Sequence, residues 1–283
     1  MTAFQAAVYA LVYGVAAVLP ISLSAHELLL SYYTEWALPP SSLYSVIILS
    51  TAGASFFYFR HDWASILSSI FRTILFWKKP MTLDERMPLF QILLFLPVTL
   101  AWFTLTSFKL DESIISSPQL WLVCIFLILF SIPLLVTENL NRRMKKMADW
   151  NWWDSLIVGI FQAFALIPGA GRQALVFSAS FFRNYQPEAI FKFVFITLTP
   201  WLALEGYFAS QGSSILLRNA NWPQIELGWL PLGIAAAVAF FSALLALGGL
   251  SRSFHIRGLK GYAYYRILLG GVTLVVMWIN KDF

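Results

Sequence analysis

The sequence carries little charge: only 12% of its 283 residues are Asp, Glu, Lys or Arg, against roughly a quarter in soluble domains. Hydrophobic residues make up 59% of the chain, and the mean hydropathy is +0.71. This apolar surplus is too large for one buried core, and it excludes a disordered chain or a nucleic-acid-binding domain. We therefore predict an integral membrane protein, with no nucleic acid as partner and its net charge of +5 concentrated in cytoplasmic loops.

Cysteine is nearly absent, since Cys124 is the only one and lies in an apolar run. The sequence thus offers no disulfide and no cysteine-based metal site. His26, His61 and His255 do not have the spacing of zinc ligands either, so no metal ligands are predicted from these residues. The first 59 residues contain no Lys or Arg, so the basic start of a cleavable signal peptide is missing.

Long apolar runs are what the sequence has in abundance. Two of them are interrupted: 4–30 by Pro20, and 155–182 by Pro168 and Gly169. Because exposed backbone cannot face lipid, we predict that both are re-entrant helical hairpins with their tips inside the protein. The short segment 63–77 is predicted to be interfacial. Six uninterrupted stretches are long enough to span a membrane, and they cover residues 43–59, 89–108, 119–137, 189–209, 228–250 and 262–279.

The distribution of basic residues orients these segments. Lys and Arg cluster within 60–86, 142–146, 183–192 and 252–266, whereas the loops 31–42, 109–118 and 210–227 are poor in them. Placing the basic loops in the cytoplasm puts both termini outside and gives each half one hairpin and three spans. An odd number of spans inverts the second half relative to the first.

The predicted fold is therefore an all-α integral membrane protein with six transmembrane helices and two re-entrant hairpins in an inverted-topology repeat. It forms a single membrane domain over 1–283. The first repeat covers 1–137, a cytoplasmic linker 138–154, and the second repeat 155–283. In such folds, binding sites form near the midplane, where the two halves meet.

Ionisable residues inside membrane segments are costly and are functional candidates by default. Arg172 is the only charge between Asp154 and Arg183, and its planar guanidinium is suited to a phosphate. Gly169 and Gly171 would let backbone N–H groups approach the same anion beside a new helix N-terminus. The sequence therefore predicts a phosphate-binding tip in the second hairpin. The alternative is that Arg172 only satisfies carbonyl groups at that tip.

The first hairpin contains one ionisable pair, His26 and Glu27. His26 is a candidate proton donor, base or phosphate ligand because its ordinary pKa is near neutral, and Ser22 and Ser24 supply hydroxyls nearby. Alternatively, these three residues only cap a helix. Glu27 is interpreted as interfacial, and Glu205 as an ordinary acidic residue near a loop.

Three segments resemble the undecaprenyl-pyrophosphate phosphatase family, also called bacitracin-resistance proteins. They are residues 13–26, which contain Pro20 and His26, residues 162–174, which contain Gln162 and Arg172, and residues 262–270. The resemblance covers essentially the whole chain. It implies the same two-hairpin fold, a bacterial inner-membrane location, a polyprenyl diphosphate carrier lipid recycled for cell-wall synthesis, and a divalent cation.

The chain departs from the family pattern at the residues that carry the chemistry. The two glutamates of the first motif fall on Tyr13 and Ala17, and the proposed nucleophilic serine falls on Leu23. A further Glu and Gln of the next span fall on Tyr44 and Ile48. Because nucleophilic and acid–base steps need a positioned base, we predict that hydrolysis by the family route is poor. The motif residues that remain are Pro20, Ser22, Ser24, His26, Gln162, Pro168, Gly169 and Arg172.

Three functions stay open at this point. The first is a polyprenyl-diphosphate phosphatase in which His26, Ser24 and Ser22 are the catalytic candidates. The second is a carrier-lipid transporter (flippase) that binds the phosphates without cleaving them, and the third is an accessory subunit of a membrane complex. In the first two, the predicted phosphate-binding residues are Arg172, Gly169, Gly171 and Gln162. The oligomeric state, the length of the lipid and the number of phosphates stay open.

Overall fold

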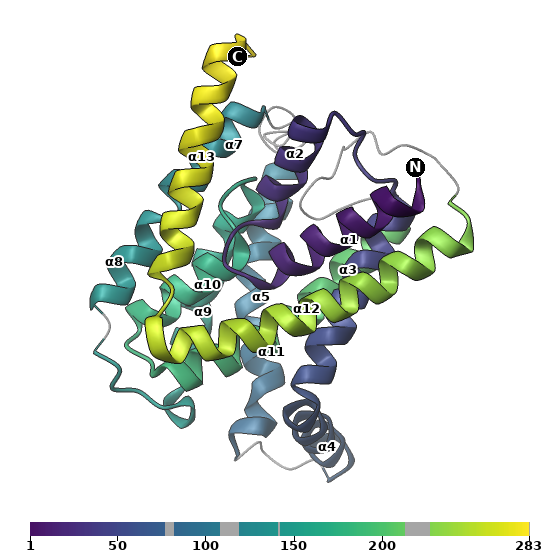
Figure 1. The fold of residues 1–283 in the computed structure, drawn as a ribbon. Helices are drawn as coiled ribbons and strands as arrows, with labels where there is room; N and C mark the ends of the chain where they lie inside the picture. The colour runs from purple at the N-terminus through teal and green to yellow at the C-terminus, as the bar shows by residue number, and fades with distance from the viewer. Residues whose placement is uncertain (77–81, 108–118, 141, 213–226, 283) are drawn as a thin grey trace.

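The computed structural model describes residues 1–76, 82–107, 119–140, 142–212 and 227–282. These residues are helical, and the only β pairing among them is an isolated bridge between Lys145 and Tyr185. Figure 1 shows the arrangement of the helices. Their bounds are α1 Ala3–Val18, α2 Leu23–Thr34, α3 Ser41–Tyr58, α4 Arg60–Phe76, α5 Leu83–Ser107, α7 Leu120–Leu129, α8 Ile132–Leu140, η1 Met147–Asp149, α9 Trp152–Ala163, η2 Phe164–Leu166, α10 Arg172–Phe182, α11 Pro187–Ser210, α12 Trp229–Arg257 and α13 Lys260–Asn280.

Six helical segments in the described residues are long and apolar enough to cross a membrane, as predicted. They correspond to the six predicted spans, with two differences. The third span, Leu120–Leu140, is broken into α7 and α8 at Phe130 and Ser131. Pro133 is the second residue of α8, and it has no N–H to continue the helical ladder from α7. In addition, α12 continues to Arg257, beyond the predicted end of its span.

Both interrupted apolar runs are broken at the predicted prolines. The chain leaves α1 at Val18 and enters α2 after Ser22; it leaves η2 at Leu166 and enters α10 after Gly171. Ser22 and Gly171, which precede the two new helices, adopt almost the same backbone conformation, with φ/ψ of 77°/104° and 77°/105°. The two tips also touch, because a Cβ atom on Gly171 would lie 3.2 Å from Cβ of Ser22. That the two hairpins re-enter from opposite faces of a membrane stays a prediction.

The helices of the two sequence halves interdigitate. Helix α1 packs along α12, and α9 packs along α5, while α3 lies against α11 at the centre. A glycine permits each of the two outer crossings: a Cβ on Gly14 would lie 2.9 Å from the carbonyl oxygen of Ala239, and one on Gly159 would lie 2.4 Å from that of Leu94. Each hairpin therefore rests on a span from the other half. The bounds of the two repeats themselves stay a prediction.

A cluster of charged residues holds the predicted linker against the second hairpin. The carboxylate of Asp154, which caps the start of α9, is fully buried and forms ion pairs with Lys145 and Arg183. The Tyr185 hydroxyl donates a 2.7 Å hydrogen bond to the same carboxylate. Burial, followed by this hydrogen bond, raises the pKa of Tyr185 above its ordinary value. The charges of this region are thus structural. The basic pair Lys78–Lys79 and the loop 109–118 lie outside the described residues, as does most of 210–227.

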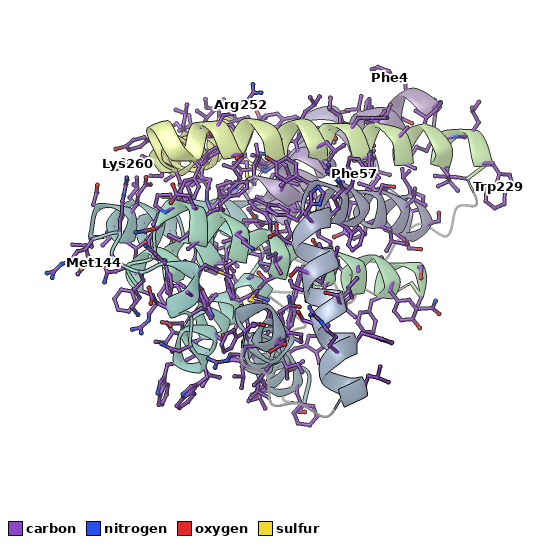
Figure 2. All side chains as sticks on the ribbon, turned by 90° about the horizontal axis from the view of Figure 1, so that it is seen from below. Phe4, Phe57, Met144, Trp229, Arg252 and Lys260 are labelled. Carbon is purple, nitrogen blue, oxygen red and sulfur yellow. The ribbon has the colours of Figure 1, made fainter. Side chains whose placement is uncertain are left out.

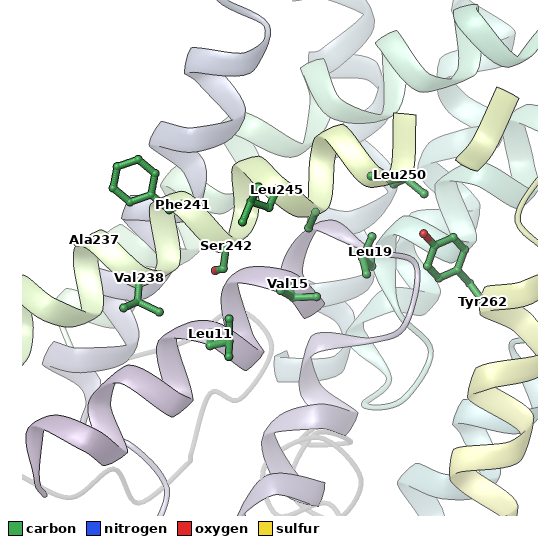
Figure 3. Close-up of a pocket in the computed structure, with 12 residues that line it drawn as sticks. Leu11, Val15, Leu19, Ala237, Val238, Phe241, Ser242, Leu245, Leu250 and Tyr262 are labelled. Carbon is green, nitrogen blue, oxygen red and sulfur yellow. The ribbon is translucent and has the colours of Figure 1, made fainter. Parts of the chain in front are cut away.

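Large apolar side chains cover much of the outer surface, as Figure 2 shows around the labelled Phe4 and Trp229. One surface groove of about 540 Å³ lies between α1 and α12 (Figure 3). Leu11, Phe241 and Leu245 line it and are at least half exposed. In a membrane such a surface contacts lipid chains, so the groove alone indicates no particular ligand.

Candidate functional site

Arg172 is the first residue of α10, at the tip of the second hairpin, and it is almost completely buried. Its Nη2 atom donates to Oε1 of Gln162 (3.2 Å) and to the carbonyl oxygen of Thr197 (3.1 Å), and its guanidinium lies 5.3 Å from the ring centroid of Trp201. Its Nε and Nη1 atoms have no hydrogen-bond partner. A buried cation with two free donors is costly unless an anion completes it. Arg172 is therefore the strongest candidate in the described residues for binding an anion.

The side chain of Arg172 lines a small cavity where the two hairpin tips meet α11. The cavity measures about 30 Å³, which admits a water molecule but not a diphosphate group. The lining side chains must move apart before a headgroup can enter. The residues around this cavity are Ala17, Ser22, Leu23, Ser24, Ala165, Gly171, Arg172, Gln173, Trp201, Leu202 and Glu205.

Most of the hairpin residues predicted from the sequence line this cavity or contact a residue that does. Ser24 accepts a 3.1 Å hydrogen bond from the backbone N–H of Gly169, so the first hairpin is joined to the second. The hydroxyls of Ser22 and Ser24 lie 3.4 Å apart. Gly169 and Gly171 have φ values of 92° and 77°, a conformation that favours glycine. The tertiary structure thus assembles Arg172, Gln162, both glycines and both serines in one place.

His26 has other partners. Its Nδ1 lies 2.8 Å from the carbonyl oxygen of Ser22, and its Nε2 lies 2.8 Å from the hydroxyl of Tyr265 on α13. The two rings also stack, with centroids 5.7 Å apart. His26 is not among the described residues that line the Arg172 cavity. In this conformation both ring nitrogens are already occupied, so His26 holds α2 to α13.

A second buried arginine, Arg266 on α13, was not singled out from the sequence. It is fully buried, and its guanidinium donates to carbonyl oxygens of both hairpin tips: Pro20 (3.4 Å), Gly169 (3.1 Å) and Ala170 (2.7 Å). It also donates to Ser131 Oγ at 3.0 Å. The role considered as the alternative for Arg172, satisfying carbonyl groups at a hairpin tip, is therefore performed by Arg266.

The locations predicted from the sequence for two acidic residues are wrong. Glu27 and Glu205 are not interfacial or near-solvent residues, because their exposed fractions are 2% and 1%. Glu205 lines the Arg172 cavity and accepts a 3.4 Å hydrogen bond from the hydroxyl of Tyr44. A residue near a loop or a helix end is not necessarily exposed to solvent. Both side chains point into the protein. The one signal in the sequence was a carboxylate within an apolar run.

The site thus combines a cation with free donors, two hydroxyls, backbone N–H groups at a helix start and a carboxylate. Such a set can bind a phosphate and move a proton beside it. The motif positions where the resemblance expects carboxylates carry Tyr13 and Ala17, which offer none. Among the described residues, moreover, no three His, Cys, Asp or Glu side chains come together as metal ligands. The motif positions therefore do not fit the divalent cation that the resemblance implies.

Comparison with known proteins shows the family to which the chain belongs. The family model described as bacitracin resistance protein BacA matches residues 6–272. A protein named undecaprenyl-diphosphatase from Myxococcus xanthus (strain DK1622) is 30% identical over 281 residues, covering 99% of this chain and 91% of the relative. One of the same name from Moorella thermoacetica is 29% identical over 283 residues, covering 99% and 100%. This multi-pass membrane protein therefore belongs to the BacA family of bacitracin resistance proteins and undecaprenyl-diphosphatases.

Proposed function

We propose that this protein binds the diphosphate headgroup of a polyprenyl carrier lipid at the Arg172 cavity, in the inner membrane of a bacterium. The observation that carries the proposal is the buried guanidinium of Arg172 with its Nε and Nη1 atoms unpartnered. Two phosphate oxygens would complete these donors in a bidentate contact. The full-length relatives named undecaprenyl-diphosphatase support the choice of lipid and its place in carrier-lipid recycling for the cell wall.

Each element around Arg172 has a part in holding the headgroup. Gln162 and Thr197 fix one nitrogen of the guanidinium, so the other two are held toward the cavity. The start of α10 adds backbone N–H groups and the positive end of a helix dipole. Ser24 and Ser22 supply hydroxyls from the other hairpin. The headgroup would thus be held between the two hairpins.

Hydrolysis by the family route should be weak in this protein. Ala17 and Leu23 stand at the motif positions of a glutamate and the serine nucleophile, and both line the cavity. The cavity therefore lacks the carboxylate and the hydroxyl that the family pattern has at these two positions. General acid–base catalysis contributes about 100- to 10,000-fold, so we expect a correspondingly low rate by that route. No step of the proposal passes through a metal ion.

Binding of a C55 isoprenyl diphosphate to the purified protein in nanodiscs tests this proposal. Arg172→Ala should weaken binding by about 10- to 100-fold, because charge-assisted hydrogen bonds contribute about 1.5–3 kcal/mol each. Arg172→Lys should recover only part of the loss, because Lys lacks the bidentate fork.

Arg252→Ala is the matched control. Arg252 is an exposed arginine on α12 (Figure 2), and its removal should leave the affinity unchanged. Equal affinities of the wild type and Arg172→Ala would refute the proposal and favour the accessory-subunit function. Phosphate release measured in the same samples, with and without Mg²⁺ or Ca²⁺, separates binding from hydrolysis.

A further inference from the structure

The two buried acids form one connected cluster although they come from opposite halves of the chain. Glu27 lies on α2 and Glu205 on α11, and the two carboxyl groups are close enough to interact electrostatically. Two carboxylates in a low-dielectric interior cannot both be ionised without a large cost. The pair therefore binds at least one proton when nothing else balances its charge.

Two tyrosines lie between these acids. The hydroxyl of Tyr44 on α3 donates to Oε1 of Glu205 at 3.4 Å. The rings of Tyr13 and Tyr44 meet edge to face, with centroids 5.9 Å apart. The hydroxyl of Tyr13 on α1 lies beside the Glu27 carboxyl group and interacts with it electrostatically. Because a phenol both donates and accepts, the Tyr44 hydroxyl can hold the Glu205 carboxyl group in place in either protonation state.

Glu205 reaches the Arg172 cavity. Its side chain lines the cavity that also contains Arg172 and Ser24. The volume of that cavity is enough for a water molecule. The carboxyl group of Glu205 and the proposed anion site therefore share one cavity.

From this geometry we infer that Glu205 is the acid–base residue of the Arg172 site, with Tyr44 as the residue that positions its carboxyl group. The inference rests on the proposed function, since it needs the diphosphate at Arg172. It differs from the family route because the carboxylate comes from α11 and not from the first motif. Glu205 accepts the proton of the attacking water itself, whereas Tyr44 acts through Glu205.

The reaction that follows from this inference is hydrolysis of the diphosphate by water. The oxygen of a water molecule attacks the terminal phosphorus, and one water proton moves to the Glu205 carboxylate. The bond between that phosphorus and the bridging oxygen breaks, and its electron pair stays on the bridging oxygen of the polyprenyl monophosphate. The products are inorganic phosphate and polyprenyl monophosphate. The proton then passes from Glu205 to an oxygen of the departing polyprenyl monophosphate, so the carboxylate is restored.

Substitutions with two separate readouts, phosphate release and lipid affinity, test the inference on the full-length protein in nanodiscs with C55 isoprenyl diphosphate. Glu205→Gln keeps the shape of the side chain but removes the base. It should lower kcat by at least about 100-fold while the affinity stays within about threefold. Tyr44→Phe removes only the hydroxyl that donates to Glu205, and it should lower kcat by about tenfold at unchanged affinity. Glu35→Gln, an exposed acid just after α2, is the matched control and should change neither.

The outcomes separate this inference from the proposed function. Phosphate release by Glu205→Gln at the wild-type rate would refute the inference, and so would a wild type that binds the lipid through Arg172 but releases no phosphate. In both results the proposed function stands. Lipid affinity that does not depend on Arg172 would refute the proposed function instead. If Glu205→Gln does not fold, Tyr44→Phe and Glu205→Asp decide, and an undiminished kcat in both refutes the inference.

Discussion

At the residue scale, the two buried arginines Arg172 and Arg266 differ in how many of their nitrogens are hydrogen-bonded. Arg266 donates from all three of its nitrogens to carbonyl or hydroxyl oxygens, whereas Arg172 uses only one of its three nitrogens. An arginine whose donors are all hydrogen-bonded stabilises the fold. An arginine with unpaired buried donors lowers the stability but can bind an acceptor. The number of unpaired donors therefore distinguishes the structural Arg266 from Arg172, the proposed anion-binding residue.

This difference predicts opposite effects on stability. Arg266→Met should leave the carbonyl groups of both hairpin tips without donors and lower the free energy of unfolding by about 3 kcal/mol. Arg172→Met removes an incompletely paired buried cation and should change it by less than about 1 kcal/mol, or raise it. Thermal unfolding in detergent without lipid checks both. An equal loss in the two variants would show that Arg172 also has a structural role.

At the element scale, the crossing of α9 over α5 depends on the absence of a side chain at Gly159. A Cβ there would lie 2.4 Å from the carbonyl oxygen of Leu94 and 3.0 Å from Cγ of Pro97. Gly159→Ala should therefore push α9 away from α5 and destabilise the protein by about 1–3 kcal/mol.

Gly233→Ala is the matched control for this crossing. Gly233 lies in the exposed part of α12, and a Cβ at that position would meet nothing within 4 Å. The exchange should therefore be neutral or stabilise by up to about 1 kcal/mol. Melting temperatures of the two variants provide the measurement. A shift of the same sign and size in both would contradict the close crossing.

At the scale of the whole molecule, the charge distribution predicts which loops are cytoplasmic. In a Cys124→Ala background, which removes the only cysteine, Met144→Cys should be labelled only from the cytoplasmic side. Met144 is 71% exposed (Figure 2), so a reagent can reach it. Ser113→Cys should be labelled only from outside, because its loop is poor in basic residues. Labelling of both from the same side would overturn the inverted topology.

The interdigitation of the two halves explains why the site needs the complete chain. Arg172 comes from the second half and Ser24 from the first, and they line one cavity whose third wall is α11. Because α1 packs on α12 and α9 packs on α5, neither half can cover its own hairpin. The same packing of helices thus forms the proposed anion site and places the Glu205 carboxyl group beside it.

The class of the protein, its six spans and the two helix breaks followed from the sequence by itself. These features depend on local chemistry: apolar length decides what spans a membrane, and the helices end where Pro20 and Pro168 are followed by glycines or serines that favour a turn or a helix start. Arg172 could be selected for the same reason, since a lone charge in an apolar run is costly in any fold.

Only the tertiary structure decided how the polar residues are paired. Membrane helices are apolar on all sides, so their hydropathy does not show which face points inward. The sequence therefore places Glu27 and Glu205 near the surface, whereas packing buries both beside Tyr13 and Tyr44, two of the three positions where the family pattern has glutamates. The roles of His26 and Arg266 likewise depend on contacts between residues far apart in the chain, such as His26 with Tyr265 and Arg266 with Pro20. Such contacts are long-range, and no local pattern in the sequence encodes them.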